Sequence, residues 1–540
     1  MTSPTPQTVL SDLASRAVYS EAAGIGRIVP AAVAAPKTAD EVRALVQWSA
    51  AAGLPLTPRG SGSSMAGGAI GPGLIIDLSL MKLLRLDARN RRIWCGPGAL
   101  RGDIERAAHS AGLRFPVDPS SGEFCTIGGM VATNAAGAHT LKHGSTRRWV
   151  TALDCIFADG SRAIIRRGDR AYHSESGAPP LDRLDPTIRA RLTEEGAAVR
   201  HAGVCKESSG YGLADFARTG DVIDLIVGSE GTLALVVGVE LELAPAAEAA
   251  SSLRATFDDL DQVASAASMV RRLGASVCEL LDSSFLRIAE SGGALPKFMR
   301  GAAAVLLVEV EADDEAGATL LLKGVKAALT ECGALSVEQA SAFEEERELW
   351  DLRHAASPIL ARDPVLKSVQ VIEDAAVPPE QMAAYIRGVR AALARQRLDG
   401  VIFGHAGDAH VHVNPLVDVR DPDWRSRLEG LLNEVTNLVT TLGGTLSGEH
   451  GDGRLRAPLL PRAWRGNNAV DLFRVVKETF DPCNILNPGV KLPLTGQQPL
   501  EMVKYDPTLE PLPAAAATAL ETVARDKAYA SHRLSLINQG

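Results

Sequence analysis

The segment P-R-G-S-G-S-S-M-A-G-G-A-I-G-P-G, residues 58–73, contains too many glycines and serines to pack as part of a core. Such a run presents backbone N–H groups and hydroxyls together, and these groups can hold a pyrophosphate. It lacks the lysine of a P-loop. A strand pattern, L-I-I-D-L-S at 74–79, follows it where a Rossmann loop requires a helix. Taken alone, the segment fits a surface loop equally well.

Two further segments share this composition. They are P-V-D-P-S-S-G-E-F-C-T-I-G-G-M-V-A-T-N-A-A-G-A-H-T-L-K-H-G at 116–144 and V-G-S-E-G-T-L at 227–233. We call residues 58–73, 116–144 and 227–233 the first, second and third loops. Three small-residue loops in one domain predict a long, flat ligand with polar edges that lies against the backbone.

The composition excludes several classes of protein. A chain of 540 residues predicts two to four domains, and 46% hydrophobic with 22% charged residues is ordinary for a globular enzyme. A net charge of −9 argues against a nucleic-acid partner. The seven cysteines are scattered without a C-x-x-C pair, which argues against disulfides, a zinc finger or an iron–sulfur cluster in this chain.

We expect no membrane span, because no run of about 18 apolar residues is present. The N-terminal residues lack the pattern of a secretory signal. We therefore expect a cytoplasmic protein, with peripheral contact at the inner membrane as an alternative.

The local patterns alternate between helix and strand. Helices are expected at 38–53 and 100–112, and strands at 73–79 and 91–98. A hairpin with Asp159-Gly160 at its turn is expected at 151–168, and two strands broken by glycines at 224–245. Residues 28–247 are thus an α+β unit, preceded by an extension, residues 1–27, with a short helix.

A shift to alanine-rich sequence at 244–252 suggests a domain boundary. Helices at 258–274, 315–333 and 379–396 and strands at 301–312 and 400–416 predict a second α+β domain over 248–470. We expect an antiparallel sheet covered by helices on one face. Residues 471–492 are expected to return to the first domain, and 493–540 to form a linker and a helical tail.

The three loops carry a resemblance. The order P-R-G-S-G-S-S, D-P-x(6)-T-I-G-G-M-V-A-T-N-A-A-G and G-S-E-G-T-L resembles the FAD-binding domain of the vanillyl-alcohol oxidase and p-cresol methylhydroxylase family. This resemblance implies contacts to FAD from Arg59, Gly60, Ser61, Gly62, Ser63 and Ser64 at the pyrophosphate, Pro119, Thr126, Gly129, Asn134 and Gly137 at the flavin, Glu230 and Gly231 at the adenosine or ribityl part, and Asn487. Some members bond FAD through a histidine in the first loop. No histidine is present there, so we expect non-covalent FAD.

Four of the eleven histidines fall between 405 and 450. On a strand, His410 and His412 point to the same face, and His405 lies across a glycine turn. Each alone fits an ordinary core or surface residue. Two neutral imidazoles with the carboxylate of Glu449 would leave positions open on a divalent cation, as in catalytic zinc sites. The spacing matches no helical H-E-x-x-H motif, which argues against a metalloprotease.

The segments F-G-H-A-G-D-A-H-V-H-V-N-P (403–415), G-G-T-L-S-G-E-H-G-D-G-R (443–454) and D-P-C-N-I-L-N-P-G-V-K-L (481–492) resemble the C-terminal domain of FAD-linked D-2-hydroxy-acid dehydrogenases. That group includes D-lactate and D-2-hydroxyglutarate dehydrogenases and the glycolate oxidase flavoprotein subunit. The resemblance implies metal ligation by His405, His412 and Glu449, with zinc or manganese as the metal. It also implies that His450 is the catalytic base and that Asn414 borders the substrate.

Two departures from that pattern stand out. Ala409 and His410 replace a Gly-Asn pair, so His410 is an extra ligand, a substrate contact or a neutral substitution. An insertion, F-A-R-T-G-D-V-I-D-L-I-V at 216–227, is typical of forms that work with an iron–sulfur module. Because this chain has no cluster motif, such a module would be a separate protein.

Residues 348–378 contain Arg353 and Lys367, a pair that fits solvated surface charge equally well. A 2-hydroxy acid needs cations for its carboxylate, and arginine offers a bidentate fork. The resemblance places an arginine, a lysine and a hydroxyl residue at Arg353, Lys367 and Ser357.

The reaction implied is oxidation of a D-2-hydroxy acid, with D-lactate favoured, to the 2-oxo acid. A metal stabilises the alkoxide, His450 takes the proton, and a hydride passes to flavin N5. We expect a homodimer and a separate electron acceptor: an iron–sulfur protein, a cytochrome or a quinone.

Two other classes remain open: a metal-independent FAD oxidase of another alcohol on the same fold, and a flavin-binding subunit without activity. A predicted helix at 514–530 places Leu520, Val523 and Ala524 on one face, which would dock on a partner or pack on its own chain.

Overall fold

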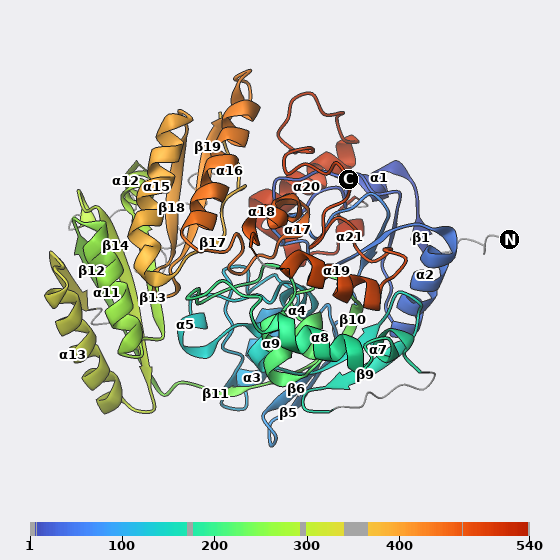
Figure 1. The fold of residues 1–540 in the computed structure, drawn as a ribbon, viewed down its shortest axis with the longest axis horizontal. Coiled ribbons are helices and arrows are strands. Elements are labelled where there is room, and N and C mark those ends of the chain that lie inside the picture. The colour runs from blue at the N-terminus through green and yellow to red at the C-terminus, as the bar shows by residue number, and fades with distance from the viewer. Residues whose placement is uncertain are drawn as a thin grey trace.

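The computed structural model describes residue 6 and residues 8–169, 177–291, 299–339, 365–466 and 468–537. The first part of the chain forms a small sheet in the order β1 (Val9–Leu10), β2 (Ala32–Ala34), β4 (Leu74–Asp77), β3 (Leu56–Arg59), with the last three strands parallel (Figure 1). The predicted helix is α2 (Ala39–Ala52). Thr38 caps its start, and Gly53 ends it with a φ of 62°.

A second sheet is antiparallel, in the order β5 (Leu84–Asp87), β6 (Arg92–Cys95), β10 (Leu235–Glu242), β8 (Val150–Ile156), β9 (Arg162–Arg166). The predicted hairpin is its β8–β9 pair. Helices α3 (Arg101–His109) and α4 (Ile127–Thr133) belong to this part. The strand predicted at the start of 224–245 is wrong, because those residues form the helix α10 (Ile223–Ile226), whose side chains are all buried. A short buried apolar run has no periodicity that separates strand from helix.

The third sheet, which we call the cap sheet, contains strands from the second half of the chain. Its order is β15 (Ser336–Gln339), β12 (Ala249–Phe257), β14 (Ala304–Ala312), β13 (Val277–Asp282), β18 (Asp399–His405), β19 (His410–Asp418), β16 (Leu366–Ser368), and β17 (Ala375–Ala376) also pairs with β19. Every pairing in it is antiparallel. The α+β class is confirmed.

The cap sheet is not covered on one face alone. Helices α11 (Leu260–Arg272), α13 (Glu315–Glu331) and α15 (Met382–Arg395) lie along one face (Figure 1). Helix α12 (Ser283–Ser291) packs on the opposite face, against Leu281, Leu307 and Val401. Because side chains alternate along a strand, this second face also carries Glu279, Glu309, His405 and His412, and these face the FAD-binding part.

After β19 the chain forms α16 (Trp424–Thr441) and then crosses back to the first domain. Short helices α17 (Gly453–Arg456) and α18 (Leu460–Ala463) lead to α19 (Ala469–Phe480), which packs on α7 (Pro179–Asp182) and α8 (Pro186–Gly196). The N–H of Gly453 donates to Glu230 of the third loop. The predicted domain limits stay predictions.

One buried ion cluster holds this return in place. The ammonium of Lys491 lies 3.0 Å from Asp452 Oδ2 and 3.1 Å from Glu230 Oε2, and donates to the carbonyl of Ser208. Lys491 and Asp452 are completely buried. Despite burial, the two carboxylates raise the pKa of Lys491 above its ordinary value. The charge of Lys491 thus joins three segments: the third loop, the segment after His450 and the C-terminal return.

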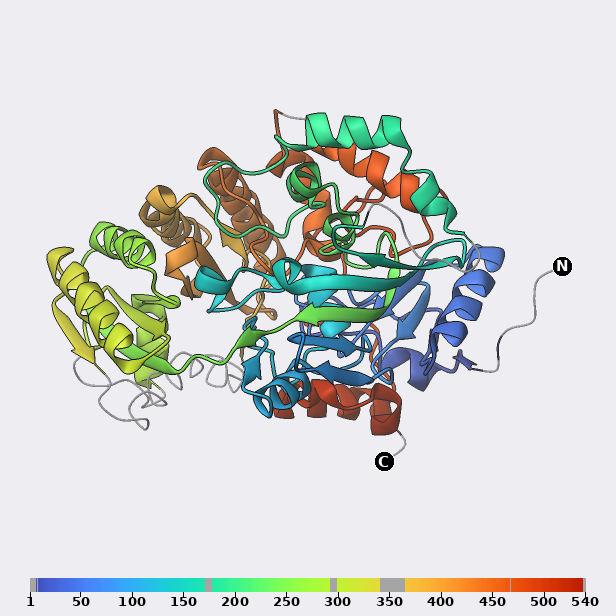
Figure 2. The same ribbon diagram turned by 90° about the horizontal axis from the view of Figure 1, so that it is seen from below.

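The tail forms α20 (Ala514–Asp526), the turn η5 (Ala528–Ala530) and α21 (Arg533–Ile537), which pack beside α1 (Leu13–Ala17), as Figure 2 shows in red and blue. Helix α20 ends earlier than predicted because Lys527 adopts a left-handed conformation. Val523 is buried within its own chain, so of the two expectations for the tail the structure favours packing on its own chain. No helix in the described part of the chain combines the length and apolar character needed to cross a membrane.

Candidate functional site

A cavity of about 1580 Å³ lies between the three loops and the cap sheet. The predicted site residues that line it are Arg59, Gly60, Ser61, Gly62, Ser63, Ser64, Pro119, Thr126, Gly129, Gly137, Glu230, Gly231, Lys367, His405, His412, Asn414, Glu449 and His450. Asn134, His410 and Asn487 are not part of its wall. Arg353 and Ser357 lie outside the described residues. Segments far apart in sequence therefore share one cavity.

The first loop follows β3 and presents its backbone to the cavity. A Cβ at Gly60 would lie 2.0 Å from Thr126 Oγ1, and Gly62 has a φ of 76°, so both positions require glycine. The guanidinium of Arg59 donates to the carbonyls of Tyr19, Glu21 and Ala69. Arg59 thus stabilises the conformation of the first loop. The backbone N–H groups and hydroxyls of that loop can then bind phosphates. Ser64 Oγ is buried without a partner among the described residues, which fits a phosphate-bearing cofactor such as FAD.

The side chains of two predicted cofactor contacts lie off the cavity wall. Asn134 ends α4 in a left-handed conformation, and its Oδ1 accepts from the N–H of Arg147. Asn487 Nδ2 donates to the carbonyls of Gly68 and Glu230, so Asn487 ties the first loop to the third. Neither side chain lies on the cavity wall, because each satisfies buried backbone groups that shape a loop.

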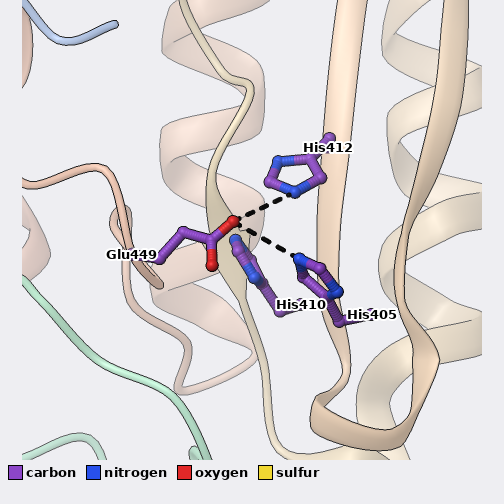
Figure 3. Close-up of side chains that lie close together, drawn as sticks. All are labelled: His405, His410, His412 and Glu449. Atoms are coloured by element: carbon purple, nitrogen blue, oxygen red, sulfur yellow. Dashed lines mark hydrogen bonds and ion pairs between the residues drawn. The ribbon is translucent and has the colours of Figure 1, made fainter. Parts of the chain in front are cut away.

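The histidine–glutamate cluster, His405, His412 and Glu449, lies on the cap side of the cavity (Figure 3). Glu449 Oε1 is 3.3 Å from His405 Nε2 and 3.5 Å from His412 Nε2. On the far side of each ring, His405 Nδ1 donates to Glu279 and His412 Nδ1 donates to the Glu373 carbonyl. Rings fixed at Nδ1 and directed with Nε2 toward a carboxylate fit a divalent cation.

A buried lysine that sequence reasoning missed faces this cluster. Lys206 Nζ lies 2.7 Å from Glu449 Oε2 and 3.3 Å from the carbonyl oxygen of Gly137. Burial would raise the pKa of Glu449, but Lys206 and His405 hold it well below its usual value. Lys206 stands in the sequence K-E-S-S-G with no periodic pattern around it, so no local signal marks it as buried.

His410 lies behind the cluster and not on the cavity wall, although Figure 3 shows its ring beside those of His405 and His412. Its Nε2 is 2.8 Å from Asp374 Oδ1. Burial and the charge of Lys206 lower the pKa of His410 to about 3, so the ring is neutral. This position does not support a substrate contact and leaves a ligand or a neutral substitution.

His450 is the most exposed of the four histidines and borders the cavity. Its Nδ1 donates to Glu373 Oε2 at 2.5 Å, and its Nε2 lies 3.6 Å from Glu449 Oε1. Burial alone would lower the pKa of His450, but Glu373 and Asp374 raise it to about 10. Arg456 donates to the other oxygen of Glu373. The ring is therefore held by Nδ1 and offers Nε2 to a ligand.

Asp374 fixes the segment that carries these residues. It accepts from Ser447 Oγ at 2.7 Å and from the N–H of His450 at 2.9 Å, and it contacts His410. Glu373 and Asp374 were missed by sequence reasoning, although two adjacent acids within the apolar run V-I-E-D-A-A-V-P signal buried charges that need partners.

Two predicted substrate contacts line the cavity. Asn414 lies on β19, and Lys367 lies on the neighbouring strand β16, paired in register with Val417. They extend the polar wall along the cap sheet from the histidine–glutamate cluster.

Comparison with known proteins agrees with this arrangement. The FAD binding domain family matches residues 30–165, and the family described as FAD linked oxidases, C-terminal domain, matches residues 246–490. The chain is 31% identical to glycolate oxidase subunit GlcD of Bacillus subtilis over 90% of this chain and 94% of that protein. The chain belongs to the FAD-linked oxidases. It is an FAD-dependent oxidoreductase, and the predicted family and cofactor are confirmed.

Other relatives and structures agree. A D-lactate dehydrogenase of Archaeoglobus fulgidus is 29% identical over 85% of this chain and 90% of that protein. The solved structure of 4-ethylphenol oxidase from Gulosibacter chungangensis superposes with a TM-score of 0.67 at 14% identity, covering 91% of this chain and 95% of that one. This second likeness shows the fold alone.

A second ionic contact joins the two halves of this oxidoreductase beside the cavity. His139, in the second loop, donates from Nδ1 to Asp118 at 2.6 Å and from Nε2 to Glu309 of β14 at 2.8 Å. Burial alone would lower the pKa of His139, but Asp118 and Glu309 raise it to about 11. The imidazolium therefore stabilises the contact between the FAD-binding part and the cap sheet.

We predict that His139 makes stability depend on pH. Its raised pKa means that the stabilisation is complete below about pH 6.5 and is lost as the pH rises toward 11, by up to about 1.4 kcal/mol per pH unit. At pH 7 the parent protein should have a higher melting temperature than His139→Gln, and this difference should be smaller at pH 9. His109 is exposed, so the control His109→Gln should melt at nearly the parent temperature at both pH values. A pH-independent difference for His139→Gln would contradict the prediction.

Proposed function

We propose that this oxidoreductase oxidises a D-2-hydroxy acid, with D-lactate preferred, to the 2-oxo acid. The observation that carries the proposal is that His450 and the histidine–glutamate cluster line the same cavity as the three loops. A hydroxy acid held by the cap sheet would have its reactive carbon next to the flavin. The relatives named D-lactate dehydrogenase and glycolate oxidase subunit support this substrate class.

The chain's polar groups suit the two ends of such a substrate. Lys367 offers a cation for the carboxylate, and Asn414 offers an amide on the same wall. Arg353 and Ser357, which lie outside the described residues, are proposed to complete that contact. Holding the carboxylate fixes the orientation of the carbon that carries the hydroxyl.

His450 is proposed to accept the hydroxyl proton at Nε2. The base role requires the neutral ring, although Glu373 and Asp374 raise the pKa of His450 to about 10. The charge of a divalent cation in the neighbouring histidine–glutamate cluster would favour the neutral form. That form donates Nδ1–H to Glu373 and presents Nε2 as an acceptor to the cavity. Once protonated, the imidazolium is stabilised by Glu373, which Arg456 holds in place. FAD, when bound, supplies the acceptor for the hydride.

We further propose that His405, His412 and Glu449 hold a divalent cation, zinc or manganese. The cation would supply Lewis-acid stabilisation of the substrate oxygen. The fixed Nδ1 partners of both rings support this, since they orient the two Nε2 atoms before a metal binds.

The metal proposal predicts that His405→Ala and Glu449→Ala lose the metal and keep FAD, because the FAD loops belong to the other domain. Metal content by plasma mass spectrometry and flavin absorbance are measured on the same samples. The exposed His109→Ala is the matched control and should keep both. Unchanged metal content in both cluster variants would contradict the assignment and favour a metal-independent oxidase of another alcohol.

The substrate proposal is tested with D-lactate, glycolate, D-2-hydroxyglutarate and D-malate and an artificial dye as acceptor. We expect D-lactate to reduce the flavin fastest. His450→Gln should keep metal and FAD but slow flavin reduction by about 100-fold to 10,000-fold, the usual contribution of a general base. Flavin reduction at a near-parental rate in that variant would remove His450 from the base role, and no reduction by any acid would overturn the substrate class.

We also propose that electrons pass to a separate acceptor and not to oxygen: an iron–sulfur protein, a cytochrome or a quinone. The reduced flavin should reoxidise slowly in air and rapidly with the dye, measured by stopped-flow absorbance. Rapid reoxidation with stoichiometric hydrogen peroxide would make the protein an oxidase. The homodimer and the cytoplasmic location likewise remain predictions. Light scattering would test the dimer.

A further inference from the structure

The C-terminal segment, residues 513–537, forms part of the wall of the FAD cavity. The family-matched regions end at residue 490, so this wall lies outside both. Six of its residues line the cavity: Glu521, Ala524, Arg525, Asp526, Lys527 and Tyr529. Figure 2 shows the segment in red, running along the lower edge of the FAD-binding part. The segment thus adds a side to the cofactor cavity that the two matched regions do not supply.

An aromatic contact fixes the end of this segment to the second loop. The rings of Tyr529 and Phe124 stack with centroids 5.2 Å apart. The left-handed Lys527 ends α20 and turns the chain so that Tyr529 reaches Phe124. Phe124 stands two residues before Thr126, the cap of α4, so the tail braces a loop that lines the cavity.

Arg533 connects the tail to the first loop. It is 3% exposed, and its Nη2 donates to the carbonyl of Ser61 at 3.2 Å. Among the described residues, neither its Nε nor its Nη1 has a hydrogen-bond partner. The guanidinium also lies 5.3 Å from the Tyr529 ring centroid. A buried guanidinium with two unused donors beside a phosphate-binding loop is costly unless a nearby anion compensates it.

The surrounding charges leave that compensation incomplete. Burial together with the charge of Arg59 lowers the pKa of Arg533 to about 10. The charge of Asp77 raises the pKa of both arginines. Asp77 also accepts from Tyr19 Oη and lies 3.3 Å from His532 Nδ1, so it does not serve the two guanidinium groups alone. Glu21, which also acts on Arg59, is already paired with Arg27.

We propose that the C-terminal segment supplies two residues for FAD binding: Tyr529 on the cavity wall, and Arg533 as a positioning residue behind the first loop. Arg533 holds the Ser61 carbonyl, so that the loop's N–H groups face the cavity, and its charge stabilises the diphosphate of FAD across the loop. Tyr529, stacked on Phe124, keeps the C-terminal segment packed against the second loop. The inference rests on the use of FAD and not on the proposed substrate.

The experiment measures release of FAD from the purified holoenzyme after dilution, by the rise in flavin fluorescence. Arg533→Met should bind FAD about tenfold to hundredfold more weakly, the range for losing a charged hydrogen bond. Arg533→Lys should lose less, and Tyr529→Ala should also release FAD faster than the parent. The melting temperature of the FAD-depleted protein is also measured with ADP and with AMP. In Arg533→Met, ADP should no longer raise the melting temperature and AMP should still raise it, because only ADP carries the diphosphate.

The matched control is Arg420→Met, which removes an exposed arginine paired with Asp418 away from the cavity. FAD release from Arg533→Met at the rate of Arg420→Met would overturn the proposal. Limited proteolysis reports whether the tail stays docked. If Arg533→Met frees the tail, Arg533→Lys decides: recovered FAD and ADP binding supports the role of the charge, and binding as weak as that of Arg533→Met overturns it. No substrate is used, so the result is independent of the proposed function.

Discussion

One buried ammonium, that of Lys491, links three separate segments beside the cavity through the carboxylates of Asp452 and Glu230. Glu230 belongs to the third loop, Asp452 follows His450 by two residues, and Lys491 belongs to the C-terminal return. Asp452 also accepts from Ser209 Oγ and the N–H of Gly210. Removing one partner from such a group costs about 3–5 kcal/mol, because it leaves a buried charge without compensation. The loop that carries Glu449 and His450 is thereby locked to the FAD-binding domain.

A second centre, Asp374, performs the corresponding task on the cap side. It binds Ser447 and the N–H of His450, and contacts His410. Residues 447–453 are thus held from both domains, by Asp374 at one end and by Lys491 at the other. This explains how a loop without regular structure presents Glu449 and His450 in fixed geometry. Precision in such a site comes from the residues behind it.

The sequence predicted what depends on local pattern or on motif. The helix ended by Gly53, the Asp159-Gly160 hairpin, the three loops and the histidine cluster were all visible in it. The helix Ile223–Ile226 was mistaken for a strand, because a short buried run is ambiguous. Lys206, Glu373 and the tail residue Arg533 were missed, since their partners stand at Glu449, His450 and Ser61, far away in sequence. Asn134 and Asn487 were predicted to contact the cofactor. Their side chains lie off the cavity wall, where Asn134 accepts from a backbone N–H and Asn487 bonds two backbone carbonyls and the guanidinium of Arg454.

The two ends of the cavity carry different charged groups. At the first loop, the guanidinium groups of Arg59 and Arg533 lie behind the position proposed for the diphosphate, and the charge of Asp77 acts on both. On the cap side, carboxylates gather around imidazoles. Glu279, Glu373, Asp374 and Glu449 contact three histidines and His450, with Lys206 and Arg456 as the fixed cations among them. The carboxylates, Lys206 and the arginines among these groups are buried, and charge interactions between buried groups are stronger than in water. An anionic cofactor at the first loop would interact favourably with the two guanidinium groups, and a divalent cation on the cap side would interact favourably with Glu449. The proposed direction of FAD, with its diphosphate at the first loop and its flavin toward His450, agrees with this distribution of charge.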